Sequence, residues 1–301
     1  MIPRRSLDEI RVDECKPLGA SGIDIPVLGW GTWKYKGGLE PLRAGIDRGA
    51  TFIDTAEVYG TEEIVGQAIA GRRSQVFLAT KVAPRNFQRD KVTEAAENSL
   101  RRLNVDHIDL YQLHWPNYTV PFEETMGAME GLVKSGKIRF IGVSNFSVRD
   151  LKRAQAALST CRIVSNQVRY SLIERTVERE LLSYCAQQKI TVIAYSPLGE
   201  AFSRLRAADA ASALGRLAAK AGKTEAQIAL NWLIAKPNVI TIPKASSVAH
   251  AIEDCGASGW RLAEAEYQLL AKNIPCHRRG PLTAALACWK RYADQIVGRQ
   301  L

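Results

Sequence analysis

The sequence has no long apolar run and no dense basic run, and each absence excludes a class of protein. No stretch of the 301 residues is uncharged over the length that a membrane-spanning helix requires. The formal net charge is +10, yet the basic clusters are pairs such as Arg72-Arg73, whereas nucleic-acid-binding tails carry runs of five or six. The charged N-terminal segment lacks the apolar stretch of a signal peptide. We therefore expect a cytoplasmic protein that binds neither membrane nor nucleic acid.

Paired cysteines and a dinucleotide fingerprint are also missing. The six cysteines form no CxxC pair, so we predict free thiols and no metal site. No GxGxxG follows any apolar run, and the segment from Gly29 to Lys34 lacks the third glycine. A nucleotide, if bound, therefore needs a binding site other than a glycine-rich dinucleotide loop.

The chain does contain eight short apolar runs that alternate with helical patterns. Continuous rather than alternating apolar runs are typical of buried parallel strands. Eight such units predict a (β/α)8 TIM barrel with helices outside, and a doubly wound open sheet is the alternative. The predicted strands are residues 27–33, 51–56, 76–82, 107–115, 138–145, 163–170, 191–197 and 239–245.

We expect residues 1–301 to form one domain, because no linker or repeat interrupts the chain. Residues 1–26 are the N-terminal segment, where turn residues predict a hairpin that closes the barrel floor. The barrel covers 27–260, and 261–301 form a C-terminal helix and tail that packs on the barrel or reaches over its mouth. Capping boxes are predicted at Ser147 with Asp150 and at Thr224 with Gln227.

Four polar residues lie at or just past the ends of three apolar runs, and together they predict an acid-base site. Asp54 lies at the end of the second run and Tyr59 in the loop after it, while Lys81 ends the third run and His114 ends the fourth. A buried lysine is costly unless a carboxylate compensates it, so Lys81 calls for a partner such as Asp54. Taken singly, each residue has an ordinary structural explanation, as a cap, packing group, surface lysine or structural histidine. Their joint placement on consecutive strands favours a site.

The chemistry of such a cluster suits carbonyl reduction. A tyrosine titrates near pH 10, roughly, so a neighbouring cation that lowers its pKa would make it a better proton donor. Lys81 is placed to be that cation for Tyr59, and Asp54 would hold Lys81 in position. His114 could donate to a substrate oxygen beside the tyrosine hydroxyl.

The strand-end motifs resemble those of the aldo-keto reductases. The segments FIDTAEVYG, LATKV, YQLHWP, IGVSNF, NQVRY, AYSPLG and IPKASS occur in that order between Val27 and Trp260. The short loop after the fourth strand resembles microbial members of the family. The resemblance implies a reversible NADPH-dependent reduction of aldehyde, ketone or sugar carbonyls, with hydride from the nicotinamide C4. The implied catalytic residues are Asp54, Tyr59, Lys81 and His114, with Tyr59 as general acid.

The same resemblance implies a cofactor site along the strand ends. Ser144, Asn145 and Gln167 match the residues that hold the carboxamide, and Tyr195 matches the aromatic that stacks on the nicotinamide. The remaining implied cofactor contacts are Gly31, Thr32, Ser196, Leu198, Gly199, Lys244, Ser246, Ser247, His250, Glu253 and Asp254.

The chain departs from the family pattern at its last motif. His250 stands where NADPH-preferring members usually have arginine, and Asp254 stands where asparagine is more usual. Lys244 can still supply a point charge to a 2′-phosphate, so we expect NADPH preference with some NADH use.

Trp33 and Trp115 would line the substrate mouth, which predicts a pocket open to small carbonyl compounds. We expect a monomer. The rival hypothesis is a barrel that binds the cofactor without catalysis and acts as a partner or sensor protein.

Overall fold

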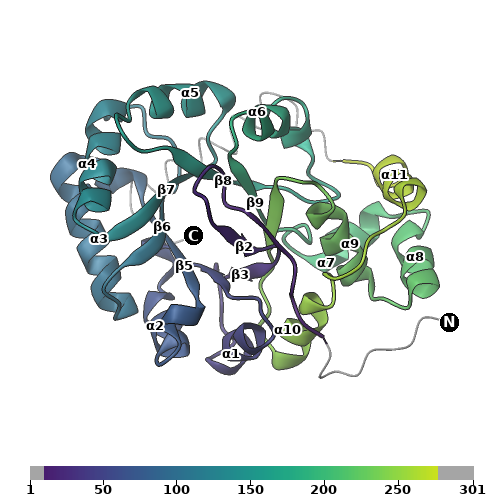
Figure 1. Cartoon of the computed structure of the whole chain (residues 1–301). Coiled ribbons are helices and arrows are strands. Elements are labelled where there is room, and N and C mark those ends of the chain that lie inside the picture. The colour runs from purple at the N-terminus through teal and green to yellow at the C-terminus, as the bar shows by residue number, and fades with distance from the viewer. Residues whose placement is uncertain (1–9, 277–301) are drawn as a thin grey trace.

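The computed structural model describes residues 10–276, and its centre is a ring of eight parallel strands (Figure 1). Neighbouring strands pair in chain order from β3 to β10. A bridge between Leu28 and Thr241, with hydrogen bonds from Thr241 N to Val27 O (3.0 Å) and from Gly31 N to Pro243 O (2.9 Å), joins the first strand to the last. The predicted barrel is thus confirmed, and an open sheet is excluded. The strands are β3 Gly29–Gly31, β4 Phe52–Asp54, β5 Phe77–Val82, β6 Ile108–Leu113, β7 Ile138–Ser144, β8 Ile163–Arg169, β9 Thr191–Tyr195 and β10 Val239–Ile242.

Helices surround the strands and bury their apolar faces against them (Figure 1). Both predicted capping boxes are present, at the starts of α5 and α9, where each cap side chain accepts from the backbone three residues on. The helices are α1 Glu40–Asp47, α2 Glu62–Ile69, α3 Arg89–Leu103, α4 Phe122–Lys134, α5 Val148–Ala156, α6 Leu181–Gln187, α7 Phe202–Ala208, α8 Ala213–Ala221, α9 Glu225–Ile234, α10 Val248–Cys255 and α11 Glu264–Asn273. The described part of the chain also forms the short 3₁₀ helices η2 Glu57–Tyr59, η3 Arg73–Gln75, η4 Pro84–Asn86 and η5 Thr176–Glu178.

An antiparallel hairpin of β1 (Cys15–Pro17) and β2 (Asp24–Pro26) lies across one end of the ring, dark purple in Figure 1. Its apolar residues Leu18 and Ile25 are fully buried in a cluster with Phe52, Val164 and other residues near the starts of the strands. Gly19 adopts φ +54°, and a Cβ there would lie 2.5 Å from the Val164 carbonyl oxygen. Close backbone approach therefore requires glycine at this turn.

The hairpin closes the N-terminal end of the barrel, so polar side chains at the strand C-termini face the other end, as in other barrels of this architecture. No helix among residues 10–276 is long and apolar enough to cross a membrane. The expected packing of the tail beyond residue 276 lies outside the described residues.

Candidate active site

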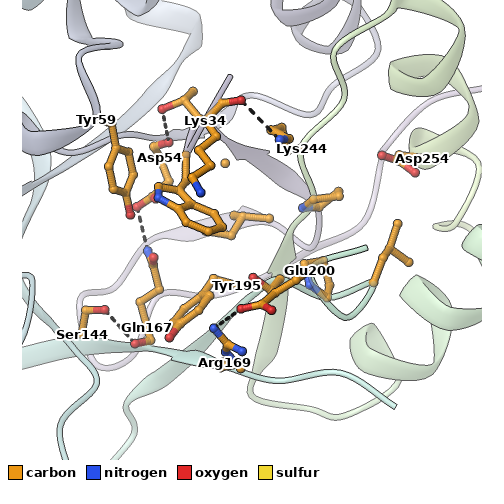
Figure 2. A pocket seen from close by; sticks show the side chains of 18 of the residues that line it. Lys34, Asp54, Tyr59, Ser144, Gln167, Arg169, Tyr195, Glu200, Lys244 and Asp254 are labelled. Atoms are coloured by element: carbon orange, nitrogen blue, oxygen red, sulfur yellow. Dashed lines mark hydrogen bonds and ion pairs between the residues drawn. The ribbon is translucent and has the colours of Figure 1, made fainter. Parts of the chain in front are cut away.

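A cavity of about 810 Å³ opens at the C-terminal ends of the strands. Its walls come from β3, β4, β7, β8, β9 and β10 and from the segments that follow the strands (Figure 2). One end contains Tyr59 and His114, and the other is bounded by α10 with His250 and Asp254. The volume falls within the range of small-molecule sites. Within the described part of the chain, no cluster of His, Cys, Asp and Glu side chains could hold a metal ion.

Beneath the Tyr59 end, Lys81 and Asp54 form a buried ion pair. Their side chains are 0% and 2% exposed, and Lys81 Nζ lies 2.5 Å from Asp54 Oδ2 and 2.8 Å from the Thr55 carbonyl oxygen. The other carboxylate oxygen accepts hydrogen bonds from the amides of Gln112 (3.0 Å) and Gln167 (2.7 Å). Both charges are thus compensated, as burial requires.

Tyr59 and His114 meet at the surface of the cavity. The Tyr59 hydroxyl lies 3.2 Å from His114 Nε2, and the two rings pack edge to face. Burial, followed by the charge of Lys81, holds the pKa of His114 well below its usual value, so the imidazole is neutral at pH 7. Together, the hydroxyl and the imidazole nitrogen can hydrogen-bond one substrate oxygen.

The expected lowering of the Tyr59 pKa by Lys81 is wrong for this structure. Burial, together with the negative charge of Asp54 and the neighbouring Tyr195, raises the pKa of Tyr59 well above its usual value. The Lys81 ammonium lies 4.9 Å from the centre of the Tyr59 ring, while its hydrogen bonds go to Asp54 and Thr55. Tyr59 is therefore fully protonated at neutral pH, and Lys81 lies beside its ring.

Glu57, which the sequence interpretation missed, ties the segment that carries Tyr59 to the next loop. One carboxylate oxygen accepts from the backbone N–H of Ala83 (2.5 Å) and from the amide of Asn86 (3.0 Å). Burial is the main cause that raises the pKa of Glu57. Because η2 ends at Tyr59, these bonds fix the position of the tyrosine.

The residues predicted to hold the carboxamide form one hydrogen-bonded group at the ends of β7, β8 and β9. Ser144 donates to the Gln167 carbonyl oxygen (3.0 Å), and Asn145 donates to Ser144 Oγ (2.9 Å) and the His114 carbonyl oxygen (3.1 Å). The Tyr195 hydroxyl donates to Asn145 Oδ1 (3.0 Å). Gln167 uses its amide nitrogen on Asp54, which links this group to the ion pair.

Positive charge gathers toward the other end of the cavity. Lys244 donates to the Lys34 carbonyl oxygen (3.3 Å), and burial followed by the charges of Lys34 and Lys36 lowers the pKa of Lys244. A Cβ on Gly37 would lie 2.9 Å from Ser246 Cα, so the loop carrying these lysines packs closely on the segment after β10. Three ammonium groups in one place favour an anionic ligand.

Most predicted site residues line the cavity, and four do not. Lys81 lies beneath the cavity, and Ser247 accepts from the backbone N–H of His250 as the N-cap of α10, so its hydroxyl already has a structural use. Ser246 and Gly199 also lie outside the lining. The predicted residues that line the cavity are Gly31, Thr32, Trp33, Asp54, Tyr59, His114, Trp115, Ser144, Asn145, Gln167, Tyr195, Ser196, Leu198, Lys244, His250, Glu253 and Asp254.

Several charged residues of the lining were not predicted. Arg169 pairs with Glu200 below the Tyr195 ring (Figure 2), and Arg206 on α7 pairs with Glu225 at the start of α9 (2.6 Å). Arg85 lies at the Tyr59 end. Arg169 lies within the NQVRY motif and could have been proposed from it, whereas Arg206 and Arg85 follow no motif.

Comparison with known proteins gives the same assignment along nearly the whole chain. Residues 27–274 match the aldo/keto reductase family. The chain is 41% identical over 264 residues to methylglyoxal reductase YeaE of Escherichia coli, covering 84% of this chain and 92% of that protein. It is 33% identical over 269 residues to glyoxal reductase of Bacillus subtilis, covering 87% and 93%. The crystal structure of an aldo/keto reductase from Klebsiella pneumoniae in complex with NADP and acetate superposes with a TM-score of 0.80 at 39% identity, covering 88% and 96%.

Proposed function

We propose that this chain, which belongs to the aldo/keto reductase family, is an NADPH-dependent reductase of small carbonyl compounds with Tyr59 as its proton donor. The observation that carries the proposal is the pairing of a protonated tyrosine hydroxyl with a neutral imidazole at the Tyr59 end of the cavity. Relatives named for methylglyoxal and glyoxal reduction support small dicarbonyls as the substrate class.

The residues of the cavity fit a nicotinamide dinucleotide. The cavity reaches from Tyr59 to α10, and the lysines near Lys244 suit phosphate groups. Gly31 lies in its wall, where a Cβ would lie 3.0 Å from the Ile242 carbonyl oxygen, so a side chain here would crowd the neighbouring strand. Lys244, His250, Glu253 and Asp254 would hold the adenosine end, and Asn145, Gln167 and Tyr195 the nicotinamide end. When bound, the cofactor supplies a hydride to the carbonyl carbon.

Side chains of the protein bind the carbonyl oxygen of the substrate and supply its proton. The Tyr59 hydroxyl and His114 Nε2 bind the carbonyl oxygen, which polarises the carbonyl bond. Tyr59 then gives its proton to that oxygen and becomes a phenolate. The Lys81 ammonium, 4.9 Å from the ring centre, stabilises the negative charge that develops there. Asp54 keeps the ammonium at this distance, and Trp33 and Trp115 would flank the substrate.

Steady-state oxidation of NADPH with methylglyoxal, glyoxal, glyceraldehyde, a nitrobenzaldehyde and a diketone tests the proposal. We expect turnover of at least the small dicarbonyls, with the alcohol as product. Binding of NADPH without turnover of any of these compounds would contradict reduction and favour the cofactor-sensor alternative. That the chain is one domain, monomeric, cytoplasmic and without affinity for nucleic acid stays a prediction.

A further inference from the structure

Three threonine hydroxyl groups form a buried chain of hydrogen bonds behind the cavity wall at the Tyr59 end. Thr61 Oγ1 lies 2.9 Å from Thr32 Oγ1 and 2.9 Å from Thr55 Oγ1, and Thr32 donates to the Asp54 carbonyl oxygen (3.1 Å). The exposed fractions of Thr32, Thr55 and Thr61 are 0%, 0% and 6%. Thr32 belongs to the cavity lining, whereas Thr55 and Thr61 lie behind it. The Thr61 hydroxyl therefore acts on its neighbours in the protein.

The direction of each hydrogen bond in this chain follows from the number of protons. A carbonyl oxygen can only accept, so the Thr32 hydroxyl gives its single proton to the bond with Asp54. Thr61 must then donate to Thr32, and Thr55 must donate to Thr61. Each proton is used once, and Thr61 at the centre both donates to and accepts from a neighbouring side chain.

The Thr61 side chain does not cap its own helix. Thr61 is the N-cap of α2, where a threonine hydroxyl ordinarily accepts a hydrogen bond from a backbone N–H of the first turn. Within residues 10–276 the Thr61 hydroxyl makes no such bond. By contrast, the N-cap hydroxyls of Ser147 at α5 and Thr224 at α9 accept from the backbone three residues on. At α2 the hydroxyl is instead used on the strands that carry the site.

The hydrogen bonds of Thr61 close the base of the loop that carries Tyr59. Residues 55–61 contain η2, which ends at Tyr59, and the bond between Thr55 and Thr61 joins the two ends of this loop. The carbonyl oxygen of Thr55 accepts from the Lys81 ammonium (2.8 Å), so the same end of the loop also holds the cation. The Thr61 hydroxyl therefore fixes Tyr59 and Lys81 relative to each other.

We propose that Thr61 is a positioning residue for proton donation by Tyr59. It ties the Tyr59 loop to Thr32 after β3, while Glu57 ties the same loop to the segment after β5, so the loop is held from both neighbouring strands. The inference rests on the proposed function, in which Tyr59 gives its proton to the carbonyl oxygen while Lys81 lies beside its ring. A displacement of about 1 Å can lower the rate of such a step by about a hundredfold.

The test compares wild type, Thr61→Val and Thr61→Ser by kcat for methylglyoxal at saturating NADPH and by the Kd for NADPH from fluorescence titration. Valine has the shape of threonine without the hydroxyl, so Thr61→Val loses both bonds. We expect its kcat to fall between about tenfold and a hundredfold, with the Kd for NADPH within about threefold of wild type. Thr61→Ser keeps a hydroxyl and should recover most of kcat.

Thr191 provides the matched control, because it is a buried threonine at the opposite end of the barrel. It is 2% exposed, donates to the Pro17 carbonyl oxygen (2.7 Å) and accepts from the Gly19 backbone N–H (2.7 Å). Thr191→Val also loses two hydrogen bonds, so it should lower the urea midpoint about as much as Thr61→Val while kcat stays within about twofold. Equal losses of kcat in the two valine variants would assign Thr61 to stability alone and overturn the proposal.

A solvent isotope effect distinguishes slow proton donation from a slower step of another kind. Because a displaced Tyr59 transfers its proton more slowly, the ratio of kcat in H2O to kcat in D2O should be larger in Thr61→Val than in wild type. An unchanged ratio in a variant with lowered kcat would mean that another step is slowed, and would overturn the proposal.

Thr55→Val carries the test if Thr61→Val does not fold, since it removes the bond between Thr55 and Thr61 from the other side. We expect a loss of about threefold to tenfold in kcat, and wild-type kcat in this variant would overturn the proposal. If wild type bound NADPH and reduced no carbonyl compound, the proposed function itself would fail, and this inference with it.

Discussion

At the Tyr59 end of the cavity the ionisable side chains bind one another, whereas at the α10 end a buried carboxyl has no partner among residues 10–276. Asp54 alone accepts from Lys81, Gln112 and Gln167. Asp254 accepts from none. The first end is organised by the protein itself, so its geometry does not depend on a ligand. The second end contains a carboxyl group that no described residue partners, so in the proposed function the cofactor meets side chains there that the protein does not hold in place.

The largest expected effect comes from breaking the ion pair at the organised end. Lys81→Met leaves the Asp54 carboxylate buried and unpaired, which we expect to cost about 3–5 kcal/mol of unfolding free energy in urea denaturation. Lys81→Met combined with Asp54→Asn removes both charges and should recover most of that loss.

An exposed pair provides the matched control. Lys220 lies 2.7 Å from Glu266 and is 73% exposed, so Lys220→Met should cost at most about 1 kcal/mol. Equal losses of unfolding free energy in Lys81→Met and Lys220→Met would show that the buried ion pair does not stabilise the protein more than the exposed pair does.

A smaller effect is expected at Glu57, which positions Tyr59 without touching substrate in the proposed mechanism. Glu57→Ala releases Ala83 N–H and Asn86, so the tyrosine shifts, and we expect kcat to fall between about tenfold and a hundredfold. The KM for NADPH should stay unchanged, and Glu57→Gln, which keeps one acceptor oxygen, should restore much of kcat. A rise in the KM for NADPH with kcat intact would instead assign Glu57 to the cofactor end.

The smallest effect is expected at the α10 end of the cavity. His250→Arg adds a permanent charge near Lys244, and because this position is exposed we expect only about a three- to tenfold gain in preference for NADPH over NADH. Ratios of kcat/KM for the two cofactors measure it. His107→Arg, which changes a histidine outside the cavity lining, is the control. No gain at position 250 would mean that this residue does not contact the phosphate.

The sequence predicted the ring of strands because strands buried on both faces are continuous apolar runs, and polar residues at their ends are then conspicuous. Asp54, Lys81 and His114 were found in this way. Contacts between distant loops leave no such pattern, so the bonds from Glu57 to Ala83 and Asn86 and the pairing of Arg206 with Glu225 were not predicted. The pKa of Tyr59 was predicted in the wrong direction because depth of burial cannot be read from spacing, and burial is the main cause that raises this pKa.

The role of Tyr59 at the organised end is tested most directly by measuring kcat and the Kd for NADPH on one preparation of Tyr59→Phe. The substitution removes the proton donor and leaves the cofactor residues in place. We predict a loss of about 10²- to 10⁴-fold in kcat with the Kd for NADPH within about twofold of wild type. A variant that keeps wild-type kcat would contradict the account, because another group would then supply the proton.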